Sequence, residues 1–324
     1  MPVYKSISII ICFYNAQDRL KETLEHIKQL KINNYSVELI LINNNSTDQS
    51  ELIIRNTLES FSGFPWLIIK EPTPGLTPAR TKGIASARSE VVLFCDDDNW
   101  LNEDYIIVGM NRLNSERNIG ILGGLGEPVS VVNFPSWFEE NQNFYAVGPQ
   151  FDAAGIVRGK RNVVYGAGMF MVKDYFNKIV SVGFKPISSD RIGNQLSSGG
   201  DSELCLAFQL AGYQIWYDDQ LQFKHFIEEK RLTLDYLKRL KKGMSESRFV
   251  TRFYLDYLNG YRPKITRLFW IKELIYALFT LENFRSSGLK RNSIFIKFLV
   301  AKRFKYNQQV DAIIQTCNSL SSLV

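Results

Sequence analysis

The chain has 324 residues, of which 45% are hydrophobic, so it can bury one large core or two smaller ones. Its four cysteines are scattered and show no CxxC spacing, which favours packed, reduced thiols of a cytosolic protein over a disulfide framework or a zinc site. The apolar run 7–14 is too short to span a bilayer and lacks the features of a signal peptide, and the run 267–279 is interrupted by Lys272 and Glu273, so we expect a soluble or peripheral protein.

The net charge of +6 is unevenly distributed. Residues 1–229 contain 20 Lys and Arg against 27 Asp and Glu, whereas residues 230–324 contain 19 against 6. This asymmetry indicates that the C-terminal region faces an anionic partner, and the candidates are phospholipid headgroups, a lipid-linked phosphate and nucleic acid. The alternative is a basic helical face that is simply solvated.

The first hundred residues alternate between apolar runs and segments with helical spacing of apolar residues. The apolar runs predict strands within 6–15, 36–48, 65–71 and 91–98. The helical spacing predicts helices within 16–31, 48–61 and 77–90, the second of them capped by Thr47 or Asp48. This alternation predicts an α/β fold with a mostly parallel central sheet flanked by helices, because the strands are apolar on both faces.

In such sheets, ligands bind at the carboxyl ends of the strands. Three polar segments follow predicted strands and are expected to converge at one edge: Tyr14 with Asn15, residues 43–48, and residues 96–98.

The chain becomes irregular and aromatic from about residue 120. A buried helix is predicted from about Ser202, ending at Gly212, and a further strand at 213–217. Beyond residue 230 the sequence is helical and basic, most clearly in 231–243 and 267–279.

Two nucleotide-binding motifs are excluded by the sequence. The first predicted strand is not followed by GxGxxG, and no GxxxxGK[ST] motif occurs anywhere in the chain. A divalent cation held by carboxylates remains, since Mg²⁺ takes one or two carboxylates together with substrate phosphates. On spacing alone, three acids such as "DDD" at 96–98 are more often a solvated turn than a metal site, but the buried strand before them and its place in the α/β order favour the cation site.

Four stretches of the chain follow one another in a distinctive order: "SIIICFYNAQDRLKETLEHI", "VELILINNNSTDQS", "GLTPARTKGIASARSEVVLFCDDDNWL" and "GGDSELCLAFQLAGYQIWY". Together they resemble family 2 of the glycosyltransferases, which has the GT-A fold and includes enzymes of bacterial polysaccharide and lipopolysaccharide synthesis. The resemblance covers about residues 6–232 and implies a catalytic domain at 1–232, followed by a basic, mainly helical extension at 233–324.

The resemblance also implies roles for the acidic motifs. Asp98 would ligate a divalent cation, Mn²⁺ or Mg²⁺, while Asp96 and Asp97 would meet the ribose or a metal-bound water. Asp201 would be the general base of an inverting transfer, and Glu203 would support it or the acceptor. As an alternative, Asp201 would only cap the helix that follows it.

His225 is placed near the metal by the same resemblance, although a histidine between aromatic residues is often only packed. In the segment that the family uses to bind the nucleobase, this chain has "NNNS" at 43–46 in place of an acid. Asn43 and Asn44, together with Tyr14, are the candidates for nucleotide binding, and the amide of Asn44 can both accept and donate. Arg80, at a predicted helix start beside Pro78, would support the base-binding loop or the diphosphate.

Aromatic residues between the two acidic motifs are weaker candidates for stacking on sugars: Trp137, Tyr145 and Tyr165.

The function expected from these residues is an inverting transfer of a sugar from a nucleoside diphosphate sugar to a hydroxyl of a saccharide or lipid-linked acceptor, in cell-surface polysaccharide synthesis. Such a hexosyltransferase-type enzyme would be cytoplasmic or peripheral on the inner face of the membrane, touching lipid through its basic extension, with no nucleic acid partner. The alternatives are a metal-dependent nucleotidyltransferase and a non-catalytic saccharide-binding assembly protein.

Overall fold

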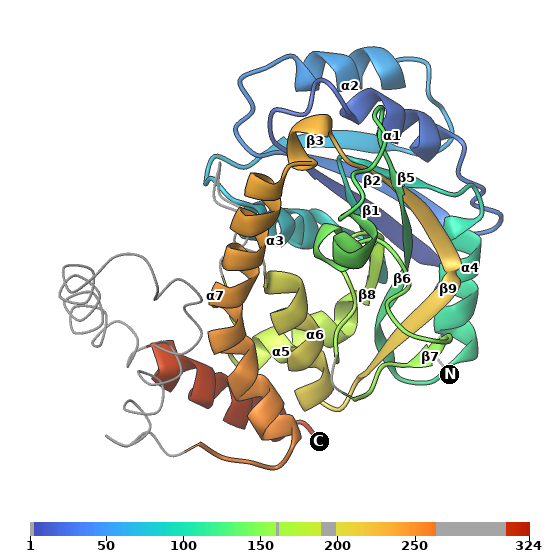
Figure 1. Cartoon of the computed structure of the whole chain (residues 1–324). Coiled ribbons are helices and arrows are strands. Elements are labelled where there is room, and N and C mark those ends of the chain that lie inside the picture. Colours follow the sequence, from blue (N-terminus) through green and yellow to red (C-terminus); the bar gives the residue numbers. More distant parts are fainter. Residues whose placement is uncertain (1–2, 160–161, 189–198, 264–308) are drawn as a thin grey trace, which may run out of the picture.

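The computed structural model describes residues 3–159, 162–188, 199–263 and 309–324 (Figure 1). Within these ranges the strands are β1 (Ser6–Phe13), β2 (Ser36–Asn43), β3 (Trp66–Lys70), β4 (Val91–Asp96), β5 (Asn99–Leu101), β6 (Ile119–Val129), β7 (Gly155–Ile156), β8 (Met169–Val172) and β9 (Gln214–Phe226). The α-helices are α1 (Leu20–Lys28), α2 (Ser50–Leu58), α3 (Leu76–Ser86), α4 (Tyr105–Ser115), α5 (Lys173–Ser181), α6 (Gly200–Leu210) and α7 (Leu234–Leu258). Two short 3₁₀ helices, η1 (Glu139–Tyr145) and η2 (Glu229–Arg231), complete these elements.

The strands form one sheet in the order β3-β2-β1-β4-β8-β6-β9-β5, with β7 paired to β9. The predicted α/β fold is confirmed, and strands β1 to β4 are parallel as expected. The second half of the sheet makes it mixed, because β8 runs antiparallel to both β4 and β6, and β5 antiparallel to β9.

Helices cover both faces of the sheet. Helices α1, α2 and α4 bury their apolar residues against one face, and α3, α5 and α6 against the other. Strand β1 contributes to both cores, with Ile9 on the first face and Ile10 on the second, each at most 1% exposed. This double burial is the physical basis of the continuous apolar runs in the sequence.

Predicted boundaries shift by a few residues. Helix α2 begins at Ser50 and its N-cap is Gln49, so the predicted capping by Thr47 or Asp48 is wrong. The carboxylate of Asp48 accepts hydrogen bonds from the backbone N–H and the hydroxyl of Ser50, just outside the helix start. The predicted strand at 213–217 is the first part of the longer β9. The predicted helix at 267–279 lies outside the described residues.

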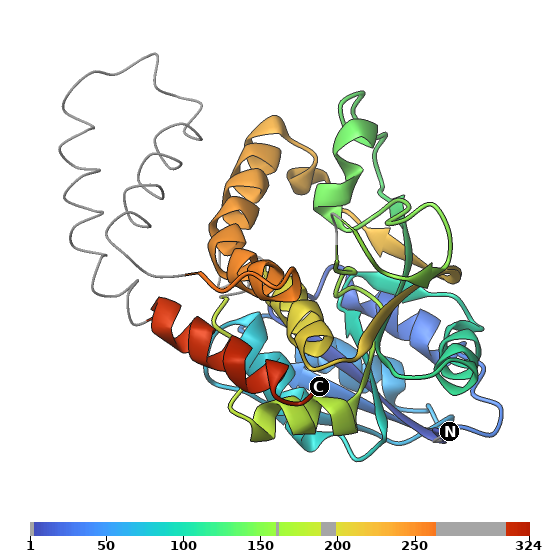
Figure 2. The ribbon, with the colours of Figure 1, turned by 90° about the horizontal axis from the view of Figure 1, so that it is seen from below.

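Helix α7 packs against other elements at both of its ends (Figure 2). Its first half lies over the segment that contains η1, in a third core cluster with Phe138 and Tyr145. Its second half enters the same core as α6 through Phe253 and Tyr254, joined there by residues 309–321, which are helical. Among the described residues, none of the helices combines the length and the hydropathy that a membrane span requires.

Candidate active site at the strand ends

The parallel strands end side by side, which brings their polar tips together. Phe13 of β1 is in register with Asn43 of β2, and Cys12 of β1 with Asp96 of β4. The backbone N–H of Asn44 then donates to the carbonyl of Phe13, at 3.0 Å. The residues predicted to converge from the ends of three strands therefore do converge.

Each of the three consecutive aspartates has its own cationic partner. The guanidinium of Arg19 binds both carboxylate oxygens of Asp97, each at 2.8 Å. Arg80 lies 3.4 Å from Asp96. Asp98 contacts His225 and Arg231, which come from a much later part of the chain and are described next. Repulsion among adjacent carboxylates is thus offset by separate positive charges, because the three side chains diverge.

Asp98 is almost completely buried, at 6% exposed, and lies between His225 and Arg231. The pairing of β5 with β9 places Asn99 opposite His225, whose Nε2 is 3.3 Å from Oδ1 of Asp98. Arg231 of η2 donates from Nη1 to Oδ2 of Asp98 at 3.0 Å. Burial opposes ionisation of Asp98, but the charge and hydrogen bond of His225 and the charge of Arg231 outweigh it and hold the pKa of Asp98 well below its ordinary value.

Two of these residues can supply ligands to a divalent cation. Asp98 offers carboxylate oxygen and His225 imidazole nitrogen, and the buried Nδ1 of His225 has no hydrogen-bond partner within the described ranges. The Nε and Nη2 of Arg231, which also lack a partner there, are cationic donors and suit an anion such as phosphate. No cluster of three or more His, Cys, Asp or Glu side chains suited to a metal occurs among the residues described. A cation here would therefore take its remaining ligands from a substrate, as Mg²⁺ commonly does with phosphates.

Asp201 reaches the strand tips through Arg80. It lies in the first turn of α6, where the N-cap is Gly199, so the alternative that Asp201 caps this helix is wrong. Its carboxylate accepts a hydrogen bond from Nη1 of Arg80, the residue whose Nη2 faces Asp96. The two acidic motifs, far apart in the sequence, thus share one guanidinium group.

Gly166 leaves room for the carboxylate of Asp201. A Cβ atom on Gly166 would overlap the carboxylate carbon and both oxygens of Asp201. With glycine at 166, the aspartate can lie directly against the backbone while it contacts Arg80.

The asparagines at the end of β2 hold the local backbone. Asn43 accepts from the backbone N–H of Ser46 and donates to Glu51, at 2.8 and 3.0 Å. The amide of Asn44 donates to the carbonyls of Glu71 and Thr73 and accepts from the N–H of Gly75. Both amides are therefore used to shape the loops beside the site, and direct contact of Asn43, Asn44 or the exposed Tyr14 with a nucleotide stays a prediction.

Of the aromatic candidates, Tyr145 is a core residue, 1% exposed, with its hydroxyl donating to the carbonyl of Arg231. Trp137 packs against the same third cluster. Tyr165 is half-buried and adjoins Gly166 in the chain, which places it beside Asp201.

Two residues of the candidate site were not singled out from the sequence: Arg19 and Arg231. Arg19 lies one residue before α1, within the first quoted motif, but nothing local distinguishes it from a surface arginine. Arg231 lies at the start of the basic region and its charge is one among many. Only contacts between distant parts of the chain identify these residues.

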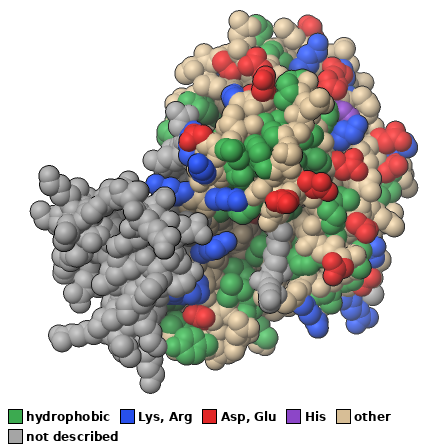
Figure 3. Space-filling model, viewed as in Figure 1, with side chains coloured by type: hydrophobic (Ala, Val, Ile, Leu, Met, Phe, Trp, Pro, Cys, Tyr) green, Lys and Arg blue, Asp and Glu red, His purple; other side chains and the backbone are tan. Residues whose placement is uncertain are grey.

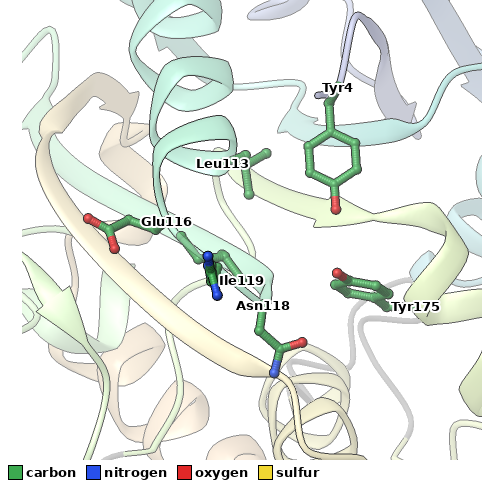
Figure 4. Close-up of a pocket in the computed structure, with 7 residues that line it drawn as sticks. Tyr4, Leu113, Glu116, Asn118, Ile119 and Tyr175 are labelled. Carbon is green, nitrogen blue, oxygen red and sulfur yellow. The ribbon is translucent and has the colours of Figure 1, made fainter. Parts of the chain in front are cut away.

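A cavity of about 360 Å³ lies elsewhere (Figure 4). It is lined by Tyr4, which precedes β1, by Leu113 of α4, by residues 116–119 leading into β6, and by Tyr175 of α5. These residues mark the amino ends of β1 and β6, opposite the acidic tips, so this cavity takes no part in the site.

Residues 8–180 match the family model described as "Glycosyl transferase family 2". This match spans more than half of the chain, and the chain therefore belongs to glycosyltransferase family 2.

Two curated relatives align with part of the chain. Glycosyltransferase GlyA of Streptococcus pneumoniae is 30% identical over 106 residues, which are 33% of this chain and 15% of GlyA. The minor teichoic acid biosynthesis protein GgaB of Bacillus subtilis is 25% identical over 135 residues, which are 42% of this chain and 14% of GgaB. The chain thus matches only a small part of the length of either protein.

Two solved structures match nearly the whole chain. TarS (residues 1–349) of S. aureus, in complex with UDP-GlcNAc, is 16% identical with a TM-score of 0.55, covering 98% of this chain and 84% of that one. The mannosyltransferase PcManGT of Pyrobaculum calidifontis, in complex with GDP-Man and Mn²⁺, is 13% identical with a TM-score of 0.53, covering 98% and 86%. At these identities the likeness confirms the fold.

Proposed function

We propose that this protein is an inverting, cation-dependent glycosyltransferase that moves a sugar from a nucleoside diphosphate sugar to a hydroxyl group of a saccharide or lipid-linked acceptor. The observation that carries the proposal is the Arg80 bridge, which joins Asp96 at the end of β4 to Asp201 on α6. An inverting transfer needs a donor site and a base on the acceptor side. The Arg80 bridge supports a donor site at Asp96 and a base at Asp201, because the side chain of Arg80 contacts both carboxylates.

Asp201 is the general base in this proposal. Its side chain is 32% exposed, so an acceptor can approach it. The carboxylate takes the proton of the acceptor hydroxyl as that oxygen bonds to the anomeric carbon and the bond from this carbon to the diphosphate oxygen breaks. Attack from the side opposite the leaving group inverts the anomeric centre, and Arg80 orients the carboxylate for it.

The leaving diphosphate is received on the other side of the site. Asp98 and His225 would hold the divalent cation, which when bound supplies Lewis-acid stabilisation of the leaving group. The unpartnered donors of Arg231, beside Asp98, are available to the phosphate oxygens. Arg19 keeps Asp97 in place next to them.

The test is release of nucleoside diphosphate from a panel that includes UDP-GlcNAc and GDP-mannose, with Mn²⁺, Mg²⁺ or EDTA. We expect turnover with a cation, none in EDTA, and near-complete loss in Asp201→Asn with donor affinity retained. Asp219→Asn, an exposed aspartate at the bend in β9, is the matched control and should keep full activity. Turnover undiminished by EDTA and by Asp201→Asn would refute the proposal, and release of nucleoside triphosphate would favour the nucleotidyltransferase alternative.

We further propose that the enzyme acts in cell-surface polymer synthesis at the cytoplasmic face of a membrane, with its catalytic domain at 1–232 and the extension at 233–324 touching lipid. The likeness to GgaB supports the first part. Exposed Lys238, Lys241 and Arg248 of α7 support the second, and Figure 3 shows basic side chains gathered along the α7 side of one face. The protein should cosediment with phosphatidylglycerol vesicles and not with phosphatidylcholine vesicles. Binding to neither kind of vesicle, or equal binding to both, would contradict the proposed contact with anionic lipid.

A further inference from the structure

Glu203 is a fully buried carboxylate two residues after the proposed base. It is 0% exposed and lies in the first turn of α6. Its oxygens accept hydrogen bonds from the backbone N–H of Ile187 at 3.0 and 3.1 Å, from the N–H of Ser188 at 2.7 Å, and from the hydroxyl of Tyr254 at 3.0 Å. A buried carboxylate is costly unless donors surround it, and here three groups from two other parts of the chain do so.

These donors connect three segments. Ile187 and Ser188 belong to the loop after α5, Glu203 belongs to α6, and Tyr254 belongs to α7. Tyr254 is itself 0% exposed and lies in the core that α6 shares with α7 and residues 309–321. The hydrogen bond from Tyr254 is therefore shielded from water and ties α7 to the start of α6.

Asp201 and Glu203 project from nearly opposite sides of the helix, because residues two apart differ by about 200° around a helix of 3.6 residues per turn. Asp201 faces Arg80 and Gly166 on the site side. Glu203 faces the core on the other side. Holding Glu203 therefore fixes the rotation and depth of the turn that carries Asp201.

We propose that Glu203 is a positioning residue for the transfer reaction, and that Tyr254 makes the C-terminal extension a structural part of the catalytic site. The inference rests on the proposed role of Asp201. In this proposal, the region after residue 232 is not separate from the catalytic domain, because it holds the helix that carries Asp201 in place in addition to any contact with a membrane. Burial raises the pKa of Glu203, and the hydrogen bonds from Ser188, Ile187 and Tyr254 act against that shift.

The test compares Tyr254→Phe with Tyr257→Phe in the full chain. Both remove a hydroxyl from a buried tyrosine of α7, but only Tyr254 contacts Glu203. We measure kcat for the nucleotide sugar that the parent turns over, the dissociation constant of its nucleoside diphosphate, and amide exchange at 187–188 and 200–205, all well below the melting temperature of each variant.

Tyr254→Phe should lower kcat about tenfold, since misplacement of a catalytic group by a fraction of an ångström has effects of this order. Its nucleotide affinity should stay within twofold, and exchange should rise at 187–188 and 200–205. Tyr257→Phe should leave all three measurements at the parent values. The inference is overturned if Tyr254→Phe keeps the parental kcat and exchange, if nucleotide affinity falls as much as kcat, or if Tyr257→Phe behaves like it. Failure of the proposed function is seen separately, as activity retained in Asp201→Asn.

Discussion

Replacing Gly166 by alanine should strongly lower kcat while leaving the fold intact. Gly166 is buried and its backbone is not in the left-handed region, so alanine is conformationally allowed there. Its methyl group would nevertheless overlap the carboxylate of Asp201. Restoring ordinary van der Waals contact requires the carboxylate to retreat by about 1 Å.

A displacement of about 1 Å at a catalytic group costs roughly 100-fold in rate, or about 2.7 kcal/mol. We therefore expect kcat for nucleoside diphosphate release in Gly166→Ala to fall about 100-fold, with nucleotide affinity within twofold of the parent. Gly63→Ala is the control, because its methyl group would press only on Phe61, in the loop between α2 and β3, and on no element of the candidate site. It should leave kcat at the parent value. A parental kcat in Gly166→Ala, or an equal loss in Gly63→Ala, would refute the geometric argument.

Two further predictions concern the arginines that the sequence did not single out. Arg231→Gln leaves Asp98 with His225 alone and removes the unpartnered donors, so we expect nucleotide affinity to fall by about 2–5 kcal/mol, measured by titration calorimetry. Lys230→Gln, whose lysine pairs only at the surface with Glu228, should bind as the parent does, and equal binding by both variants would contradict the role of Arg231. Arg19→Gln removes the two-point partner of Asp97 and should lower the free energy of unfolding by about 1–3 kcal/mol in urea denaturation. The exposed pair of Arg55 and Glu51 offers the comparison, because Arg55→Gln should change the free energy of unfolding by less than about 0.5 kcal/mol. Similar losses of stability in Arg19→Gln and Arg55→Gln would disprove the reasoning.

The fold of the first hundred residues could be predicted because its pattern is local. Apolar runs such as that in β1 are buried on both faces, and their period and length distinguish strands from helices without reference to distant residues. The second half of the sheet could not be predicted in this way. β8 and β6 pair antiparallel, and nothing in the local sequence of either strand specifies the direction of its partner.

The sequence by itself determined the alternation of strands and helices, the polar tips at the strand ends and the two acidic motifs. These features depend on the pattern of apolar residues and the chemistry of side chains that are close together in the chain. Tertiary structure alone decided which charges meet. Arg19 and Asp97 are 78 residues apart, Arg80 and Asp201 are 121 apart, and Asp98 and Arg231 are 133 apart. Each of these pairs forms because packed strands and helices bring distant segments into contact, and a buried carboxylate is stable only where such packing supplies its partner.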